Sequence, residues 1–335
     1  MNIINDKFKS LEKLIGNTPL IEISFKYKEE LMRIFTKLEY YNFSGSIKDR
    51  VALYILKKAY MDGNIKKGDT IVEATSGNTG ISFASIGKFL NHNVSIYIPD
   101  FMSSERINLL KSFGANVNLV SRANGSFIGC ISKASDYCNT HKNVFLPSQF
   151  SNNDNTLSHY NLTAPEILNT LTKNCIIPDA FIAGVGTGGT IMGVSKYLKE
   201  NVPGITAYPL EPANSPTLSS GYTGSHHRIQ GISDEFVPQI LDLSSLDSII
   251  SVDDSDAIIM AQKLSKDLGL GVGISSGANF IGALKILLKL GPNSNVITIF
   301  ADDNKKYLST DLMKIEQVKP NLLSSDVELI SIKVL

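Results

Sequence analysis

Short apolar runs alternate with helical patterns along most of this chain, and that alternation limits its fold more than any other feature. The runs TIVEA (70–74), VSIYI (94–98) and VITIF (296–300) are almost continuously apolar, and segments with apolar residues at helical spacing stand between such runs. Strands of this kind are typical of parallel sheets that helices cover on both faces. The sequence therefore predicts an α/β protein with mostly parallel sheets.

Helix ends are also visible in the sequence. A helix is expected from Lys48 to Asp62, with Gly63 just past its end. Another is expected to start after Ser103, which would cap it, and to stop at Gly114. These signals place turns and helix starts close to several predicted strands.

Composition and charge argue against several kinds of protein. The chain has 335 residues, enough for about two domains. Its 32 basic and 32 acidic residues cancel, so nothing favours nucleic acid or a membrane surface as a partner. No apolar run reaches the roughly 18–20 residues of a membrane helix, and the N-terminus lacks the apolar core of a signal peptide. Cys130, Cys138 and Cys175 lack C-x-x-C spacing, so we expect reduced thiols, no metal and a cytoplasmic location.

The domain organisation follows from a polar stretch, SQFSNNDNT (148–156), which is expected to mark a break. We expect residues 43–151 to form a smaller, mobile α/β domain, and residues 1–42 with 152–312 to form a larger one. Residues 313–335 would be a tail, in which VELISIKVL alternates like an extra strand, either at a sheet edge or swapped.

Four turns stand where a ligand could bind, because open α/β sheets bind ligands beyond the carboxyl ends of their strands. In SGSIKDR (44–50), Lys48 stands at a helix start, where the helix dipole disfavours an ammonium ion. This position suits a neutral amine, the form that makes Schiff bases with carbonyl compounds. The alternative is a surface lysine paired with Asp49. If this turn were the only evidence, the surface lysine would be the better interpretation.

The other three turns offer anion-binding groups. ATSGNTG (74–80) combines hydroxyls with backbone N–H groups at a helix start, although helix capping would also explain it. GVGTGGT (184–190) fits G-x-G-x-x-G, which is a weak signal alone. It leaves a dinucleotide-binding fold open, because Glu211 ends the next strand where a ribose-binding acid would stand. In GISSGAN (273–279), Ser275 and Ser276 open a helix, and capping explains them as well as a ligand does.

Together these turns resemble the fold-type II pyridoxal phosphate enzymes, and within them the cysteine synthase group. The resemblance covers roughly residues 10–312 and implies a tryptophan synthase β-like fold of two three-layer α/β domains. Its motifs occur in the family's order: IGNTPL (15–20), NFSGSIKDR (42–50), TSGNTG (75–80), QFSN (149–152), GVGTGGT (184–190), EPANSP (211–216), HRIQGI (227–232), GISSGA (273–278) and YLSTDL (307–312).

The resemblance implies a role for each turn. Lys48 would hold pyridoxal 5′-phosphate as a Schiff base and later move the substrate α-proton. Asn78 would bond the ring hydroxyl, and Ser275 would face the pyridine nitrogen. A serine there leaves the ring neutral, which favours expulsion of a β-leaving group followed by β-addition. The phosphate would lie on Gly186, Thr187, Gly188, Gly189 and Thr190, and the substrate α-carboxylate on Thr75, Ser76, Thr79 and Gln149.

Two departures from the family pattern change the expected chemistry. Phe43 replaces the usual proline in the lysine turn. After HRIQG the family has small residues, but this chain has Ser233, Asp234 and Glu235. The resemblance then is to the family's hydrogen-sulfide-producing cysteine (hydroxyl) lyase variant, in which Asp234 would be the general base that adds water, giving L-serine from L-cysteine. Glu235 is the weaker candidate because neighbours in an extended loop point apart.

Other functions stay open at this stage. Asp234 and Glu235 could be two solvated loop acids, and the enzyme would then be a cysteine synthase that makes L-cysteine from O-acetylserine and sulfide. A more distant alternative is an NAD-dependent oxidoreductase that uses GVGTGG and Glu211. A non-catalytic relative is also conceivable, although the intact Lys48 argues against it. The family further implies a homodimer.

Overall fold

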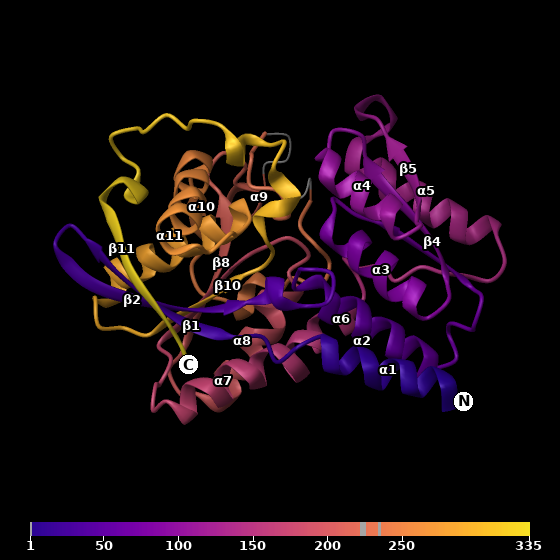
Figure 1. Cartoon of the computed structure of the whole chain (residues 1–335), viewed down its shortest axis with the longest axis horizontal. Helices are drawn as coiled ribbons and strands as arrows, with labels where there is room; N and C mark the ends of the chain where they lie inside the picture. The colour runs from indigo at the N-terminus through magenta and orange to yellow at the C-terminus, as the bar shows by residue number, and fades with distance from the viewer. Residues whose placement is uncertain (1, 222–225, 234–235) are drawn as a thin grey trace.

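The computed structural model describes residues 2–221, 226–233 and 236–335. Its strands form two sheets, one of seven strands and one of four. The two sheets lie side by side, with the smaller one at the right of Figure 1. The prediction of an α/β fold with mostly parallel sheets is confirmed. The domain boundaries stay a prediction, although every strand of the smaller sheet falls between residues 70 and 145.

The larger sheet has the order β11-β1-β2-β10-β7-β8-β9. The last five strands in this order, β2, β10, β7, β8 and β9, run parallel to one another. All five residues of β10 are buried, as expected of a strand covered on both faces. The strands are β1 (Leu20–Tyr27), β2 (Glu30–Leu38), β7 (Ala180–Gly184), β8 (Thr206–Pro212), β9 (Ile250–Val252), β10 (Val296–Phe300) and β11 (Val327–Val334).

The smaller sheet is wholly parallel and has the order β5-β4-β3-β6. Its strands are β3 (Thr70–Ala74), β4 (Asn93–Pro99), β5 (Asn116–Val120) and β6 (Val144–Phe145). Helices α2 and α3 bury one face of it, and α5 buries the other.

Helices cover both faces of the larger sheet in the same way. Helices α10 and α11 pack on one face, and α7 and α8 pack on the other. The helices are α1 (Asn2–Leu14), α2 (Lys48–Met61), α3 (Asn78–Phe89), α4 (Ser104–Ser112), α5 (Ser126–Thr140), α6 (Asn153–Ser158), α7 (Ala164–Lys173), α8 (Gly189–Asn201), α9 (Thr217–Ser220), α10 (Asp254–Leu268) and α11 (Ile274–Leu290). No helix within the described ranges is both long and apolar enough to cross a membrane.

Helix α2 ends one residue before its predicted end and is anchored by buried charges. Gly63 adopts φ +75° just beyond the helix, and the N–H of Asn64 closes the turn on the carbonyl of Ala59 at 2.8 Å. Near the other end, the fully buried Arg50 pairs with Glu39 at 2.6 Å and with Glu166 of α7 at 2.7 Å. These pairs hold the first turn of α2 against the larger sheet.

Candidate active site

All four of the predicted ligand-binding turns meet in one pocket beyond the carboxyl ends of β7 and β10. Seven of the predicted cofactor residues line it: Lys48, Asn78, Gly186, Thr187, Gly188, Thr190 and Ser275. Gly189 lies just behind this surface, at the first position of α8. Residues that are distant in sequence thus converge where an α/β sheet places its ligands.

Lys48 occupies the first position of α2 and faces this pocket. The carboxylate of Asp49 is buried and turned to Ser44, whose backbone N–H donates to it at 2.6 Å and whose hydroxyl donates to its other oxygen. Phe43 packs edge-on against Phe89, with ring centroids 6.4 Å apart. The replacement of proline by Phe43 is therefore accommodated on the outer side of the turn, while Lys48 keeps its place at the pocket.

The glycine-rich turn lies close against the loop that carries Gly231. A Cβ added to Gly186 would approach the carbonyl oxygen of Gly231 to 2.5 Å, so only glycine fits there. Gly188 has φ +87° and precedes α8, whose first N–H groups face the turn. Such an arrangement of backbone N–H groups at a helix start binds anions such as phosphate.

His159 contacts one of the pocket residues, and the sequence did not indicate it. Its Nε2 lies 3.3 Å from Thr190 Oγ1. Burial, followed by the positive charges of Lys48 and Arg50, holds the pKa of His159 well below its usual range, so the imidazole is neutral. It begins a π-helical turn, His159–Thr163, and such turns are frequent at functional sites but have no clear sequence signal.

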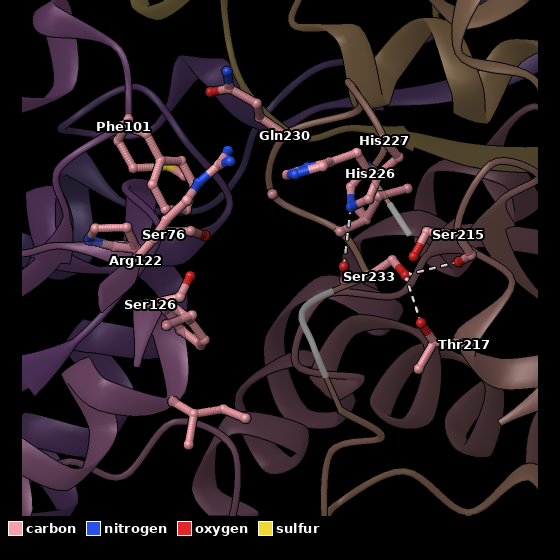
Figure 2. Close-up of a pocket in the computed structure, with 16 residues that line it drawn as sticks. Ser76, Phe101, Arg122, Ser126, Ser215, Thr217, His226, His227, Gln230 and Ser233 are labelled. Carbon is pink, nitrogen blue, oxygen red and sulfur yellow. Dashed lines mark hydrogen bonds between the residues drawn. The ribbon is translucent and has the colours of Figure 1, made fainter. Parts of the chain in front are cut away.

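The predicted carboxylate-binding residues split into one exposed to a cleft and three buried ones. Ser76 lines an adjoining cleft of about 490 Å³, opposite Ser215, Thr217 and Ser233 in Figure 2. Thr75, Thr79 and Gln149 are buried just behind. Thr79 Oγ1 donates to Gln149 Oε1 at 2.6 Å, and Thr75 Oγ1 accepts from the N–H of Gly77 at 2.9 Å. The cleft continues into the pocket, because Gln230, Gly231 and Ile232 line both.

The comparisons with known proteins agree with this geometry. A family model described as "Pyridoxal-phosphate dependent enzyme" matches residues 11–302. The chain belongs to this family. It is 40% identical over 299 residues to a probable cysteine synthase of Bacillus subtilis (strain 168), covering 89% of this chain and 96% of that one.

A solved hydrogen sulfide-producing enzyme from Fusobacterium nucleatum is more similar. It is 55% identical, with a TM-score of 0.95, over 99% of this chain and 100% of that one. An aspartate-to-asparagine variant of the same enzyme, solved with an α-aminoacrylate intermediate, gives a TM-score of 0.96 at 55% identity over 98% and 100% of the two chains. The chain is therefore a pyridoxal phosphate-dependent β-replacement enzyme of the cysteine synthase family.

The pocket offers complementary atoms for this cofactor. Asn78 Nδ2 donates to Asp302 Oδ2 at 2.8 Å, and Tyr307 donates to the same oxygen at 2.7 Å. The remaining oxygen of Asn78, Oδ1, is buried and has no hydrogen-bond partner within the described residues. A ring hydroxyl could donate to it, and the α8 start could hold a phosphate. The residues present therefore fit pyridoxal phosphate.

Asp302 is a second site residue that sequence reasoning missed. It is fully buried and orients the amide of Asn78, although the two residues are 224 positions apart. Burial and the neighbouring Asp302 raise the pKa of Tyr307 well above its usual range, so the phenol keeps its proton and remains a donor to Asp302. This pair fixes which face of Asn78 turns to the pocket.

The loop that carries the predicted general base is described only in part. Asp234 and Glu235 lie outside the described residues. Ser233, the residue before them, is fixed in place: its N–H donates to the carbonyl of Val185 at 2.7 Å, and its hydroxyl donates to the carbonyl of Ser215 at 3.2 Å. Ser233 also lines the cleft (Figure 2).

Helix α4 connects the two sides of the cleft, because it lies on the side of the smaller sheet and contacts residues on the side of the larger sheet. Arg106 is buried, donates to Gln230 across the cleft, and lies over the Tyr307 ring at 4.6 Å. A Cβ on Gly77 would approach Arg106 Cδ to 2.4 Å, so the predicted carboxylate-binding turn (75–80), the carboxylate loop, rests on this arginine. Ser103 precedes α4 as predicted, but its capping role is wrong. Its hydroxyl instead donates to the carbonyl of Lys306 at 2.8 Å, which docks the helix start.

The proposed ribose-binding acid has a different role. Glu211 is fully buried, and its carboxylate accepts from the N–H groups of Leu218 and Ser219 and from the hydroxyls of Ser219 and Ser251. It therefore holds the start of α9 rather than facing a ligand. With the family match, this overturns the dinucleotide alternative.

One further acid lies beneath the predicted carboxylate-binding residues. Glu73 at the end of β3 is 3% exposed, and its two oxygens accept from the backbone N–H groups of Ala74 at 2.9 Å and Gln149 at 3.2 Å. Burial raises the pKa of Glu73 to about 7, against the lowering effect of these N–H groups. Glu73 thus ties Gln149 to the strand that carries Thr75.

Proposed function

We propose that this enzyme converts L-cysteine and water into hydrogen sulfide and L-serine. The sulfur leaves as sulfide, and the oxygen of water takes its place on the β-carbon. The carrying observation is the cleft beside the cofactor pocket, with Ser76 on one wall and Ser233, the neighbour of Asp234, on the other. The 55% identity to an enzyme that produces hydrogen sulfide supports the same reaction.

Each turn of the pocket has a task in this proposal. Bound pyridoxal phosphate supplies the electron sink that lets an amino acid lose its β-substituent and accept a new one. The amine of Lys48, which faces the pocket, moves the α-proton. Ser275 presents a hydroxyl rather than a carboxylate, so it does not hold a ring nitrogen protonated.

The carboxylate loop orients the substrate. Ser76 already faces the cleft, whereas the hydroxyls of Thr75 and Thr79 and the amide of Gln149 are engaged with protein groups. A bound carboxylate would accept from the Thr79 hydroxyl in place of Gln149 Oε1, because Gln149 Nε2 already donates to the carbonyl of Ala74 at 2.7 Å. This exchange gives the loop a reason to move when substrate enters.

Asp234 supplies the base in the second half of the reaction. Water is a weak nucleophile and must lose a proton as it attacks the β-carbon. A positioned carboxylate provides this and also repels the hydrosulfide ion. The Fusobacterium nucleatum variant that lacks one aspartate was solved with an intermediate that follows loss of the β-substituent, as expected if an aspartate there acts after that loss.

The test is Asp234→Asn, with Glu235→Gln as the matched control. With cysteine as the sole substrate, the parent should release serine and sulfide in equal amounts. Asp234→Asn should release a first equivalent of sulfide per site, while serine formation slows about 10²–10⁴-fold. Glu235→Gln should behave as the parent does. Serine production at the parent rate by Asp234→Asn would show that Asp234 is only a loop acid.

The second candidate function is that of a cysteine synthase. The 40% identity to the Bacillus subtilis protein favours it as directly as the other similarity favours the lyase. Measuring cysteine formation from O-acetylserine and sulfide beside serine formation from cysteine separates the two. A faster rate in the first assay would make the synthase the better assignment.

We also propose that the protein works in the cytoplasm as a homodimer. The family resemblance supports the dimer. The three cysteines support a reducing compartment, because no disulfide joins Cys130, Cys138 and Cys175. Light scattering of the purified holoenzyme would measure the mass directly.

A further inference from the structure

Strand β11 forms one edge of the larger sheet, on the side away from the smaller sheet in Figure 1. It lies beyond residues 11–302, the region that matches the family. Among the described strands it pairs with β1 alone. Ile330, Ile332 and Val334 are 45%, 41% and 66% exposed. An open edge with exposed apolar residues is a template for another strand.

The backbone of β11 shows which residues offer hydrogen bonds at this edge. The N–H of Leu335 donates to Leu20 at 3.0 Å, and the carbonyl of Asp326 accepts from Lys28 at 3.4 Å, so both residues face β1. Alternate residues of an antiparallel strand face the opposite way, and a register shift adds one residue near Ile330. If this alternation is followed inward from Asp326 and from Leu335, four residues direct their backbone N–H and C=O groups away from β1, toward the open edge: Val327, Leu329, Ile332 and Val334.

The same four residues also share a face of the sheet. They lie opposite four buried residues of β1: Tyr27, Phe25, Ile23 and Ile21. Their side chains therefore lie on the core face of the sheet, the face that α10 and α11 cover farther from the edge. Glu328 and Lys333 lie on the other face, opposite Lys26 and Glu22. Apolar and charged residues are thus separated by face along the open edge.

We propose that β11 pairs antiparallel with β11 of a second copy of this chain, with the two-fold axis between Ile330 and Ser331. Leu329 then lies opposite Ile332 of the second copy, and both point their backbone groups outward, so they exchange hydrogen bonds. The extra residue near Ile330 occurs in both copies, so the two bulges meet at the axis and the pairing continues on either side of it. The axis produces a second copy of the Leu329–Ile332 pair, and these two pairs form the centre of the ladder.

The charges fit the same register. Glu328 lies opposite Lys333 of the second copy at a position without backbone hydrogen bonds, where Cα atoms are about 4.5 Å apart. Since each of these residues already opposes the opposite charge on β1, a row of alternating charge would cross the interface. The row runs Lys26, Glu328, Lys333 of the second copy and Glu22 of the second copy.

Agreement of backbone, face and charge in one register identifies the occupant as a second copy rather than an unrelated strand. At the ends of the ladder the pairing is weaker, because the carbonyl of Val327 already accepts from Lys263 of α10. The interface therefore depends on residues 328–333. It does not rest on the proposed reaction, and it concerns residues outside the cofactor pocket.

The first test traps the pair as a disulfide. In one extended strand, residues 328 and 333 are about 17 Å apart, too far for a bond within one chain. Mild oxidation of the holoenzyme carrying Glu328→Cys and Lys333→Cys together should therefore give a covalent dimer, mapped to these two positions. Each single variant is the control and should stay uncrosslinked. Equal crosslinking in the double and single variants, or none in any, overturns the register.

The second test uses charge reversal and sedimentation velocity. Lys333→Glu or Glu328→Lys should weaken self-association about 10- to 100-fold, because each places two like-charged pairs at the axis. Combining both changes with Lys26→Glu and Glu22→Lys, which restores opposite charges on β1 as well as across the axis, should recover the parent's association, while Glu30→Lys on β2 should leave it unchanged. A monomeric parent would show instead that the bulge and Lys333 keep this edge single, and a dimeric parent whose mass the reversals leave unchanged would show that the two copies meet at another surface.

Discussion

Replacement of Glu73 by glutamine tests whether the acid beneath the carboxylate loop holds a proton in the folded enzyme. The side chain is buried at the end of β3, where its carboxyl oxygens accept hydrogen bonds from the backbone N–H groups of Ala74 and Gln149. Burial raises its pKa from 4.5 to about 7. Between these two values the folded chain keeps a proton on Glu73 that the unfolded chain has lost.

The sign and size of the effect follow from this difference in bound protons. Stability falls as pH rises wherever the folded state binds more protons, at about 1.4 kcal/mol per pH unit for one group. Across the window from 4.5 to 7, Glu73 therefore costs the parent about 3 kcal/mol, and about 2–3 kcal/mol of this is lost between pH 5 and pH 8. Glutamine does not titrate, so Glu73→Gln lacks this loss.

Glutamine has a second effect, which does not vary with pH. It has one acceptor oxygen instead of two, so the N–H of Ala74 or Gln149 loses its partner at a cost of about 1–2 kcal/mol. Glu73→Gln should therefore be less stable than the parent at pH 5 and more stable at pH 8. Urea unfolding at four pH values, with cofactor held at one concentration, measures the difference. Parallel stability profiles for the two proteins would refute the raised pKa of Glu73.

Three further predictions concern the cofactor pocket and the cleft. Borohydride reduction followed by peptide mapping should label Lys48, and Lys48→Ala should lose both the label and the visible absorbance, whereas Lys57→Ala on the outer face of α2 should keep both. Gly186→Ala should weaken cofactor binding at least about tenfold in an absorbance titration, because its Cβ would approach the Gly231 carbonyl to 2.5 Å; the remote Gly204→Ala should bind as the parent does. An unreactive amino acid should reduce the radius of gyration in solution scattering by closing the carboxylate loop, and identical profiles with and without it would count against closure.

The parts of the fold that sequence predicts best are those with a local physical signal. TIVEA and VITIF coincide with β3 and β10, because strands buried on both faces need continuous apolar runs. Helix α2 ends one residue before its expected end, because Gly63 supplies the left-handed turn there. Helix α1 was not predicted, although Ile4, Phe8 and Leu11 recur at helical spacing and form the face that packs into the core.

The candidate site divides in the same way. The turn motifs are local, so their resemblance to the family could name Lys48, Asn78 and Ser275 from sequence, and the structure brings them to one pocket. Asp302 and His159 act through contacts that only the folded chain creates, and neither stands in a distinctive motif. Glu73 did carry a signal: it is the one charged residue in an otherwise apolar strand, although its bond to Gln149 is visible only in three dimensions.

The docking of α4 has a mechanical consequence for the cleft. Three consecutive contacts fasten this helix to the segment after β10: Ser103 to the carbonyl of Lys306, Glu105 to the hydroxyl of Ser309, and Arg106 to the face of Tyr307. The Arg50 pairs hold the smaller sheet's half at a second point, the start of α2, so this half should swing about the line between α4 and that point rather than slide. Displacement then grows with distance from that axis. Helix α5 lies far from this axis, so a small rotation that begins near Gly77 would move the cleft residues of α5 by a larger distance.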